Sequence, residues 1–266
     1  MTEPLLGRLD EVASEIGAAS HFLLCLDFDG TLAPIVPDPA DAHISGETRA
    51  VLERLTSLPG VTIAVVSGRS VRDLQTRVGL NVILAGNHGL EMIEGNTRWR
   101  NPAAATWEPL LHEICRELVV RAGQIPGALV EDKGLTASFH YRNVASAEVP
   151  LISQILNSVV APRHEYFFLR KGRKVFEILP RARWDKGSAV LRILERLRKT
   201  QSGEIAVCYI GDDTTDECAF QQLPGGITVR VGESQSTTAR FRVAGDSEVS
   251  KFLNWISTAT DLIGRR

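Results

Sequence analysis

The chain has 266 residues, of which 44% are apolar and 23% are charged, and its formal net charge is −2. This is the ordinary balance of a soluble globular protein, and the length suffices for one large domain or two small ones. The small net charge argues against nucleic acid as a partner, because phosphate-backbone binders usually carry a clear basic excess.

The N-terminus carries acidic residues from Glu3 onward and an early Pro4, so we expect an amphipathic first helix rather than a signal peptide. No apolar run approaches the roughly 18 residues needed to span a bilayer, so we expect no membrane association. The four cysteines are scattered and form no CxxC pair, which favours reduced thiols over a disulfide framework or a zinc site. These features predict a cytoplasmic protein.

Four continuous apolar runs predict strands that are buried on both faces of a parallel sheet, at 22–27, 61–66, 82–86 and 205–210. Helical patterns lie between or beside them, at 47–58, 70–78 and 186–198. The alternation of strand and helix implies βαβ units. We therefore predict an α/β fold with a Rossmann-like parallel sheet.

The middle third breaks this rhythm with two successive helix-strand-strand patterns. Their helices are expected at 104–122 and 147–160, and their strands at 128–131, 135–142, 165–169 and 174–178. We expect an antiparallel α+β module inserted into the parallel domain, with a single irregular sheet as the alternative. Pro102 and Pro180 mark plausible boundaries, which predicts a core of 1–101 and 181–266 around an inserted cap of 102–180.

Asp27 and Asp29 end the first apolar run, and Gly30 and Thr31 follow at once. The Asp-x-Asp spacing alone is a weak signal, but ligands bind at the carboxyl ends of strands in open α/β sheets. A carboxylate can attack phosphorus when a divalent cation screens the repulsion between the two anions. Asp27 would then form an aspartyl-phosphate, and Asp29 would protonate the leaving oxygen and later deprotonate the attacking water.

Three further segments begin or end predicted elements. Ser67-Gly68-Arg69 ends the second apolar run, Lys186 opens a helix, and the acidic stretch 212–217 follows the last run. Each has an ordinary explanation, with Ser67 as a helix cap, Lys186 as a solvated charge and Asp212 at a helix N-terminus. Their joint occurrence favours a phosphoryl-transfer site, and Mg²⁺ suits its carboxylate ligands.

These segments resemble the four motifs of the haloacid dehalogenase superfamily of phosphotransferases, from about residue 20 to 231. The inserted module is similar to the cap of its sugar-phosphate phosphatase branch. The resemblance implies that Asp27 is the nucleophile and Asp29 the acid/base. It further implies phosphate binding by Thr31, Ser67, Gly68 and Lys186, and Mg²⁺ binding by Asp27, the Asp29 carbonyl and Asp212, supported by Asp213 and Asp216.

Other segments resemble those of trehalose-6-phosphate phosphatases, namely 86–91, 131–134, 140–142 and 177–180. That resemblance implies substrate binding by Asn87, His88, Glu131, Lys133, Arg142 and Glu177, with Asn87 in a supporting role. Charged side chains that form several strong hydrogen bonds suit a sugar with many hydroxyls. The alternatives are that His88 is structural, that Glu131 and Lys133 are ordinary turn charges, and that Glu177 pairs with Arg173 or Lys174 on the surface.

The site residues predict a Mg²⁺-dependent phosphomonoester hydrolase, and the resemblance implies that its partner is a small molecule, trehalose 6-phosphate. A phosphatase of sucrose phosphate or mannosyl phosphoglycerate is an alternative, because the core motifs do not exclude it. A signalling receiver domain is disfavoured by the length of the chain. A sugar-phosphate sensor without turnover is disfavoured by the intact acid/base position at Asp29.

Overall fold

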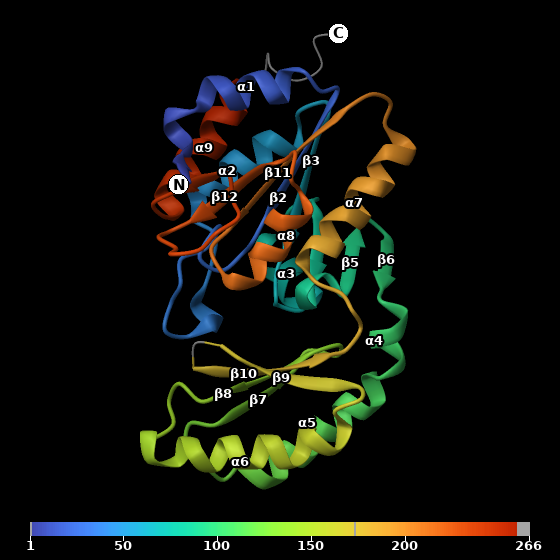
Figure 1. Cartoon of the computed structure of the whole chain (residues 1–266), viewed down its shortest axis with the longest axis vertical. Coiled ribbons are helices and arrows are strands. Elements are labelled where there is room, and N and C mark those ends of the chain that lie inside the picture. Colours follow the sequence, from blue (N-terminus) through green and yellow to red (C-terminus); the bar gives the residue numbers. More distant parts are fainter. Residues whose placement is uncertain (1, 173, 260–266) are drawn as a thin grey trace. The chain divides into compact units, whose positions relative to one another are not determined.

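The computed structural model describes residues 2–172 and 174–259 of the chain (Figure 1). These residues form two compact units. The first unit consists of the described residues up to Arg98 together with those from Asp185 onward, and the second unit is Trp99–Trp184. The chain therefore crosses between the units twice.

Among the described residues, the first unit is built on a nine-stranded sheet in the order β1-β13-β12-β11-β2-β3-β4-β5-β6 (Figure 1). Its central strands are β2 (His21–Leu26), β3 (Val61–Val66), β4 (Ile83–Gly86), β11 (Ile205–Gly211) and β12 (Ile227–Val231). Neighbours in this central series pair in parallel. The predicted α/β fold around a parallel sheet is confirmed.

Strand β2 shows why a continuous apolar run forms a central strand. Successive side chains point to opposite faces of a sheet, so a run that is apolar throughout is stable only when both faces are covered. Leu24 and Leu26 pack in the main core together with Ile63 and Val65 of β3. Leu23 and the other residues of β2 are buried as well, so neither face of this strand meets solvent.

Helices surround this sheet and account for the predicted helical patterns. They are α1 (Leu9–Gly17), α2 (Gly46–Thr56), α3 (Val71–Val78), α7 (Lys186–Thr200), α8 (Glu217–Gln222) and α9 (Asp246–Thr258). Side-chain caps fix several N-termini, because they satisfy backbone N–H groups that the helix leaves unpaired. Asp185 caps α7 by accepting from the Ser188 N–H at 2.7 Å, which makes Lys186 the first residue of that helix.

The edges of the sheet hold strands that the sequence patterns do not predict. One edge carries β13 (Phe241–Val243) and β1 (Glu3–Pro4), and the other carries β5 (Glu91–Glu94) and β6 (Thr97–Arg100). β5 runs antiparallel to β4. These strands are short or carry polar residues, so they lack the long apolar run that identifies a central strand.

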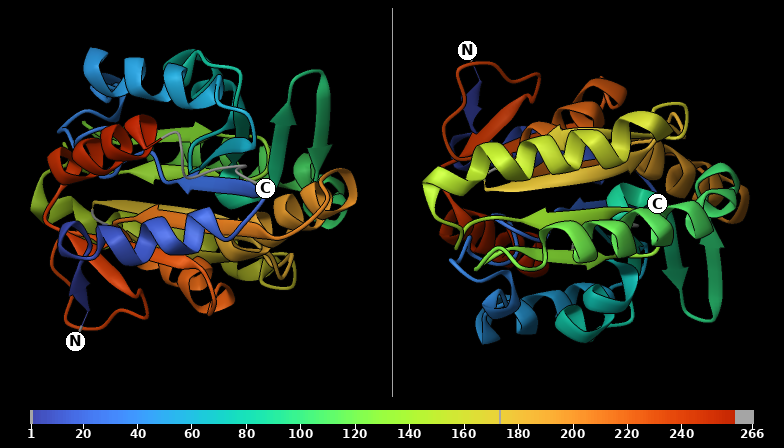
Figure 2. Two further views of the ribbon diagram at one scale, coloured as in Figure 1. Left: turned by 90° about the horizontal axis from the view of Figure 1, so that it is seen from above. Right: turned by 90° about the horizontal axis from the view of Figure 1, so that it is seen from below.

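The second unit is a separate α+β module. Its antiparallel sheet consists of β7 (Leu129–Asp132), β8 (Ala137–His140), β10 (Val175–Pro180) and β9 (Phe167–Lys171), in that spatial order. The short α4 (Pro102–Thr106) precedes two longer helices, α5 (Glu108–Ala122) and α6 (Val149–Val160). These two lie side by side over one face of the sheet (Figure 2). Both predicted helix-strand-strand patterns are confirmed, with ends shifted by a few residues and with the helix predicted at 104–122 divided into α4 and α5.

None of the helices in the described part of the chain is long and apolar enough to cross a membrane.

Candidate active site

Strand β2 carries Asp27 to the carboxyl edge of the parallel sheet. The Asp27 N–H donates to the Ile210 carbonyl at the end of β11 (2.9 Å), so the two strand ends are held side by side. Gly30 then turns the chain with φ 80, in the left-handed region that favours glycine. A Cβ at Gly30 would lie 2.1 Å from Asp212 Oδ2, so this glycine also allows Asp212 to approach the turn.

Lys186 lies between two buried carboxylates. Its Nζ donates to Asp27 Oδ1 at 2.9 Å and to Asp216 Oδ1 at 2.8 Å. Burial works to lower the pKa of Lys186, but Asp216 and Asp27 raise it overall, so the side chain stays positively charged. The structure thus places the lysine that opens α7 in direct contact with the aspartate that ends β2.

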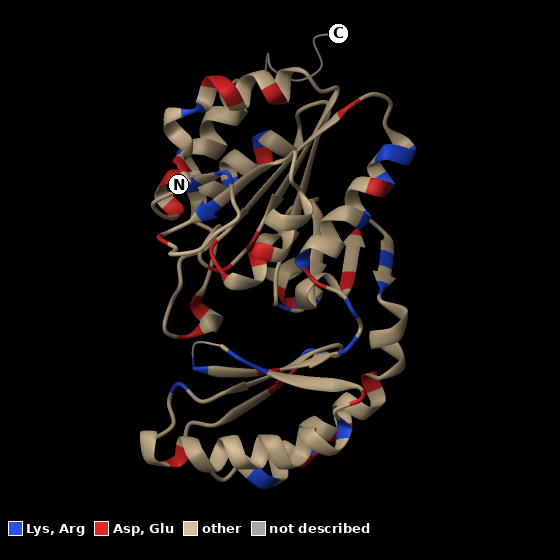
Figure 3. Ribbon diagram, in the orientation of Figure 1, with Lys and Arg blue, Asp and Glu red and all other residues tan. Residues whose placement is uncertain are grey.

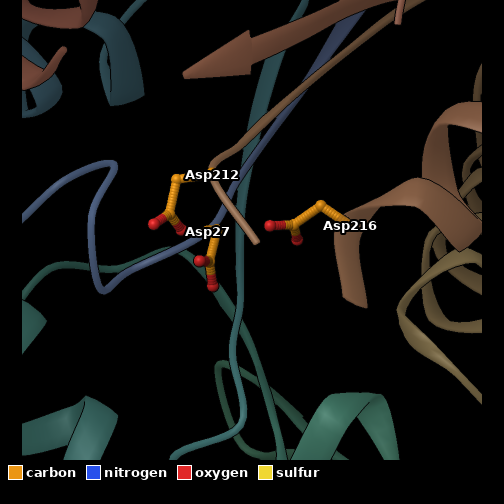
Figure 4. Close-up of side chains that lie close together, drawn as sticks. All are labelled: Asp27, Asp212 and Asp216. Carbon is orange, nitrogen blue, oxygen red and sulfur yellow. The ribbon is translucent and has the colours of Figure 1, made fainter. Parts of the chain in front are cut away.

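Asp27, Asp212 and Asp216 point toward one another (Figure 4), and one oxygen from each lies within 4.8 Å of the others. Acidic residues gather in this region, where β11 ends and α8 begins (Figure 3). Burial raises the pKa of Asp27, with the Asp216 and Asp212 carboxylates adding to the effect of burial and Lys186 opposing it. Burial and Asp216 raise the pKa of Asp212 to about 6. Three carboxylates face one ammonium, so the cluster suits a divalent cation.

The three carboxylates differ in how many oxygens remain available to a metal. Asp216 Oδ1 accepts from Lys186 and from the Tyr209 hydroxyl (2.7 Å), and its Oδ2 accepts from the Asp213 N–H (2.9 Å). Asp216 is also fully buried. Protein donors therefore use three of the roughly four acceptor directions of Asp216, which makes it the anchor for Lys186 and leaves Asp27 and Asp212 with more oxygen positions open to a metal.

Asp213 is turned to its own loop. Its Oδ1 accepts from the Thr214 N–H at 2.7 Å, and the Asp216 side chain accepts from the Asp213 N–H in return. This reciprocal capping closes the loop after β11. It holds the loop that carries Asp212.

Thr31 and Ser67 bring hydroxyl groups to the same edge of the sheet. Thr31 is 1% exposed, and its Oγ1 has no hydrogen-bond partner among the described residues. A buried polar group without a partner costs free energy, so this hydroxyl suits a bound anion. Ser67, which is also buried, accepts from the Arg69 N–H at 3.3 Å. Gly68 leaves room for a ring, because a Cβ there would lie 2.7 Å from His88 Cε1.

Asn87 and His88 form a strained turn beside this segment, with φ values of 51 and 57. The His88 N–H donates to the Ser67 carbonyl at 2.8 Å. The Asn87 amide donates to Glu91 Oε1 (2.8 Å), and Asn87 is fully buried. Asn87 therefore shapes the turn, whereas His88 lies next to Gly68.

Arg69 is a residue of this edge to which the sequence assigns no role. Its Nε donates to Asp29 Oδ2 at 2.7 Å and its Nη2 to Asp29 Oδ1 at 2.6 Å, which is a bidentate ion pair. The sequence feature that could have identified Arg69 is its position just after the strand β3, whose neighbour in the sheet, β2, leads to Asp27. The structure thus places the carboxylate of Asp29 against Arg69.

In the second unit, the strand register places polar residues in one row across the sheet. Glu131 and Glu177 both lie opposite Ser138, and Glu177 also lies opposite Arg170. Residues opposite one another project from the same face, and the apolar neighbours on the other face pack against α5 and α6. The row therefore lies on the face that the helices leave uncovered.

Ion pairs connect this row. Glu131 Oε2 contacts His140 Nε2 at 2.9 Å and Lys133 Nζ at 3.8 Å. Glu177 pairs with Arg170 at 2.7 Å, and Arg173, one of the partners considered from the sequence, lies outside the described residues. Arg142 follows β8 in the chain. The predicted sugar-binding residues Glu131, Lys133 and Glu177 are thus gathered on or beside one sheet within their unit.

The chain is similar in sequence to known phosphatases over most of its length. A sequence model of the trehalose-phosphatase family matches residues 25–248. The chain is 34% identical over 263 residues to trehalose-phosphate phosphatase B of Arabidopsis thaliana, covering 93% of this chain and 69% of that protein. It is 35% identical over 246 residues to the trehalose-phosphate phosphatase of Mycolicibacterium paratuberculosis, covering 88% of this chain and 62% of that protein. The chain therefore spans slightly less than two thirds of the length of that mycobacterial relative.

Solved structures share the fold. The C-terminal domain of Candida albicans trehalose-6-phosphate phosphatase superimposes with a TM-score of 0.79 at 24% identity, covering 97% of this chain and 99% of that one. A haloacid dehalogenase-like hydrolase from Bacteroides thetaiotaomicron gives a TM-score of 0.62 at 16% identity, covering 89% of this chain and 99% of that one. The family match over most of the chain and the identity to the Arabidopsis protein show that the chain belongs to the trehalose-phosphatase family.

Proposed function

We propose that this chain hydrolyses trehalose 6-phosphate to trehalose and inorganic phosphate. The observation that carries the proposal is the buried Asp27 carboxylate, held by Lys186 and faced by Asp212, in a chain of the trehalose-phosphatase family. A buried carboxylate beside a fixed ammonium has the position and the charge partner that a nucleophile toward a phosphate ester needs.

In the first step, an Asp27 carboxylate oxygen attacks phosphorus and the bond from phosphorus to the sugar oxygen breaks. The leaving oxygen takes its proton from Asp29, which becomes a carboxylate. In the second step, Asp29 removes a proton from water, the water oxygen attacks phosphorus, and the bond to Asp27 breaks. Both aspartates return to their initial states. Lys186 and the hydroxyls of Thr31 and Ser67 bind the phosphoryl oxygens.

We propose Mg²⁺ as the cofactor, held by Asp27, Asp212 and the Asp29 carbonyl. Support comes from the surplus of carboxylates at the site and from the raised pKa of Asp212, both of which indicate more negative charge than Lys186 alone neutralises. When bound, Mg²⁺ neutralises this charge and lowers the repulsion between the phosphate and Asp27.

We propose that Glu131, Lys133 and Glu177 of the second unit bind the hydroxyls of the sugar, together with Arg142. The row of polar side chains across one sheet face supports this role, because hydroxyl-rich ligands require several charged or polar partners. His88, next to Gly68, is proposed to contact the same substrate, and Asn87 to hold the turn that carries it.

We propose the cytoplasm as the compartment. The buried thiols of Cys25, Cys115 and Cys208 are not in disulfides, as is usual in a reducing environment.

The decisive experiment is phosphate release from trehalose 6-phosphate in the presence of Mg²⁺. Asp27→Asn keeps the size of the side chain and removes the nucleophilic oxygen charge, so we expect kcat to fall at least about a thousandfold. The urea midpoint of the variant, measured in parallel, shows whether it is folded. Equal turnover by the folded variant and the natural chain would rule out Asp27 as the nucleophile.

A substrate panel identifies the sugar. We expect trehalose 6-phosphate to be turned over with a higher kcat/KM than sucrose phosphate or mannosyl phosphoglycerate, and Glu131→Ala to lower kcat/KM for trehalose 6-phosphate by at least about tenfold. A preference for another ester would change the substrate and leave the reaction. Binding of trehalose 6-phosphate without phosphate release would favour a sensor.

A further inference from the structure

Arg69 connects Asp29 to two other parts of the first unit. Besides its two bonds to Asp29, its Nη1 donates to Asp73 of α3 at 2.8 Å, and its Nη2 also donates to the Pro39 carbonyl at 2.9 Å. The guanidinium lies over the Phe28 ring, 5.1 Å from its centroid. Four hydrogen bonds and a ring contact therefore hold one planar group, whose side chain is only 11% exposed.

Arg77 secures the same loop without a bond to Asp29. Its Nη1 donates to the carbonyls of Ala40 (3.0 Å) and Ala42 (2.6 Å), and its Nε donates to Asp73 at 2.8 Å. Arg69 and Arg77 thus both bond to Asp73. Both also bond to the segment formed by the turn η2 (Pro39–Asp41) and Ala42. Within the described part of the chain, Arg69 bonds to the catalytic carboxylate and Arg77 does not, which makes Arg77 a matched control.

Resting on the proposed function, we propose that Arg69 is the positioning residue for the acid/base Asp29, which it holds in one orientation through a bidentate contact anchored on Asp73 and Pro39. The Asp29 side chain is 42% exposed, so packing alone does not fix its rotamer. A guanidinium fork fixes both oxygens in one plane, which the single ammonium of lysine cannot do.

The fork leaves the carboxyl group able to react. A carboxylate has about four lone-pair directions, and the two bonds from Arg69 use one on each oxygen. In the first step the proton of the Asp29 carboxylic acid takes one of the remaining directions and faces the leaving oxygen, and in the second step a remaining lone pair faces the attacking water. Arg69 thus acts through Asp29, by placing the oxygen that exchanges the proton, and takes no proton itself.

The diagnostic measurement is the dependence on the leaving group. A sugar hydroxyl is a poor leaving group and needs the proton from Asp29, whereas the nitrophenolate of p-nitrophenyl phosphate leaves without one. We expect Arg69→Gln and Arg69→Lys to lower kcat/KM, which reports the steps up to departure of the leaving group, at least about tenfold for trehalose 6-phosphate and less than about threefold for p-nitrophenyl phosphate. A parallel loss of kcat/KM with both esters would overturn the proposal, because the nitrophenolate leaves without the proton from Asp29.

A double-mutant cycle with trehalose 6-phosphate tests the same idea without the second ester. If Arg69 acts through Asp29, Arg69→Gln has less than about a twofold further effect on kcat in an Asp29→Asn background. The same fold loss in both backgrounds would contradict the proposal. The double-mutant cycle alone tests the role of Arg69 if p-nitrophenyl phosphate is turned over too slowly to measure.

Arg77→Gln separates positioning from loop stability. It removes contacts to the same loop and to Asp73, so we expect a lower urea midpoint, with kcat/KM for both esters within about threefold of the natural chain. A selective loss on trehalose 6-phosphate in Arg77→Gln would assign the effect to the loop instead of Arg69. Absence of phosphate release from any sugar phosphate by the natural chain would be a failure of the proposed function itself.

Discussion

Tyr209 forms a hydrogen bond with one of the charged groups of the site, the Asp216 carboxylate. It is fully buried on β11, and its hydroxyl donates to the Asp216 oxygen that also holds Lys186. Tyr209→Phe removes this hydrogen bond and keeps the ring, which packs edge-on against Phe220 with centroids 5.8 Å apart. Asp216 then pulls Lys186 more strongly away from Asp27. We expect kcat to fall about tenfold and KM to change less than about twofold in steady-state phosphate release.

Phe220→Leu is the control for Tyr209→Phe. It loosens the packing around the same ring but leaves the Tyr209 hydroxyl on Asp216. We expect a lower urea midpoint with kcat within about twofold of the natural chain. If Tyr209→Phe lowered only the midpoint and left kcat unchanged, Tyr209 would be a packing residue.

The place of some of these residues in the site can be predicted from the sequence, and that of others cannot, for a physical reason. Asp27, Lys186 and Asp212 each stand at a predicted strand end or helix start, so their side of the sheet follows from topology alone. The partners of Arg69 and Tyr209 depend on rotamers and on which sheet face a strand residue meets. A pattern of residue types carries no such information, and both residues are therefore assigned only from the structure.

At the scale of elements, β2 begins with a buried histidine that makes its stability depend on pH. His21 is 6% exposed, its Nε2 lies 2.8 Å from Thr62 Oγ1 of β3, and burial lowers its pKa below 6.5. The unfolded chain therefore binds more protons than the folded one as pH falls below about 6.5. The folded state keeps this contribution above that pH and loses it on acidification. We expect the urea midpoint to fall between pH 7.5 and 5.5, and His21→Gln to reduce that fall.

His43→Gln is the matched change at an exposed histidine. Because this change leaves the buried imidazole of His21 in place, we expect the variant to keep the full pH dependence of the natural chain. An equal reduction in both variants would show that burial of His21 is not the cause.

The elements that can be predicted from the sequence are those whose buried positions are occupied by apolar residues. β2, β3, β4 and β11 are covered on both faces and read as unbroken apolar runs, so the sequence identifies them. β6, with the sequence TRWR, lies at the edge of the sheet and is mostly exposed. Its pairing is decided by backbone hydrogen bonding to a neighbour, which residue type hardly constrains.

At the scale of the whole chain, the inserted module can be recognised in the sequence because the alternation of strand and helix gives way to two helix-strand-strand patterns. The compact units divide at 98–99 and 184–185, whereas the boundaries expected at Pro102 and Pro180 stay predictions for where an isolated domain begins and ends. Trp99 and Trp184 stand at the two ends of the second unit with ring centroids 5.0 Å apart. Contact between two residues so far apart in sequence is a tertiary property, which no local pattern reveals.

Thermal unfolding of the chain with and without Mg²⁺ tests whether Asp212 binds the metal. Burial and Asp216 raise the pKa of Asp212 to about 6, so the ionised carboxylate destabilises the fold at pH 7.5 unless a cation is bound. We expect Mg²⁺ at a hundredfold excess over Kd to raise Tm by about 5 °C. Asp212→Asn is expected to raise Tm in EDTA and to abolish the response to Mg²⁺, as followed by thermal denaturation. Asp213→Asn, whose side chain caps Thr214, is expected to keep that response. The reverse pattern would assign the metal to Asp213.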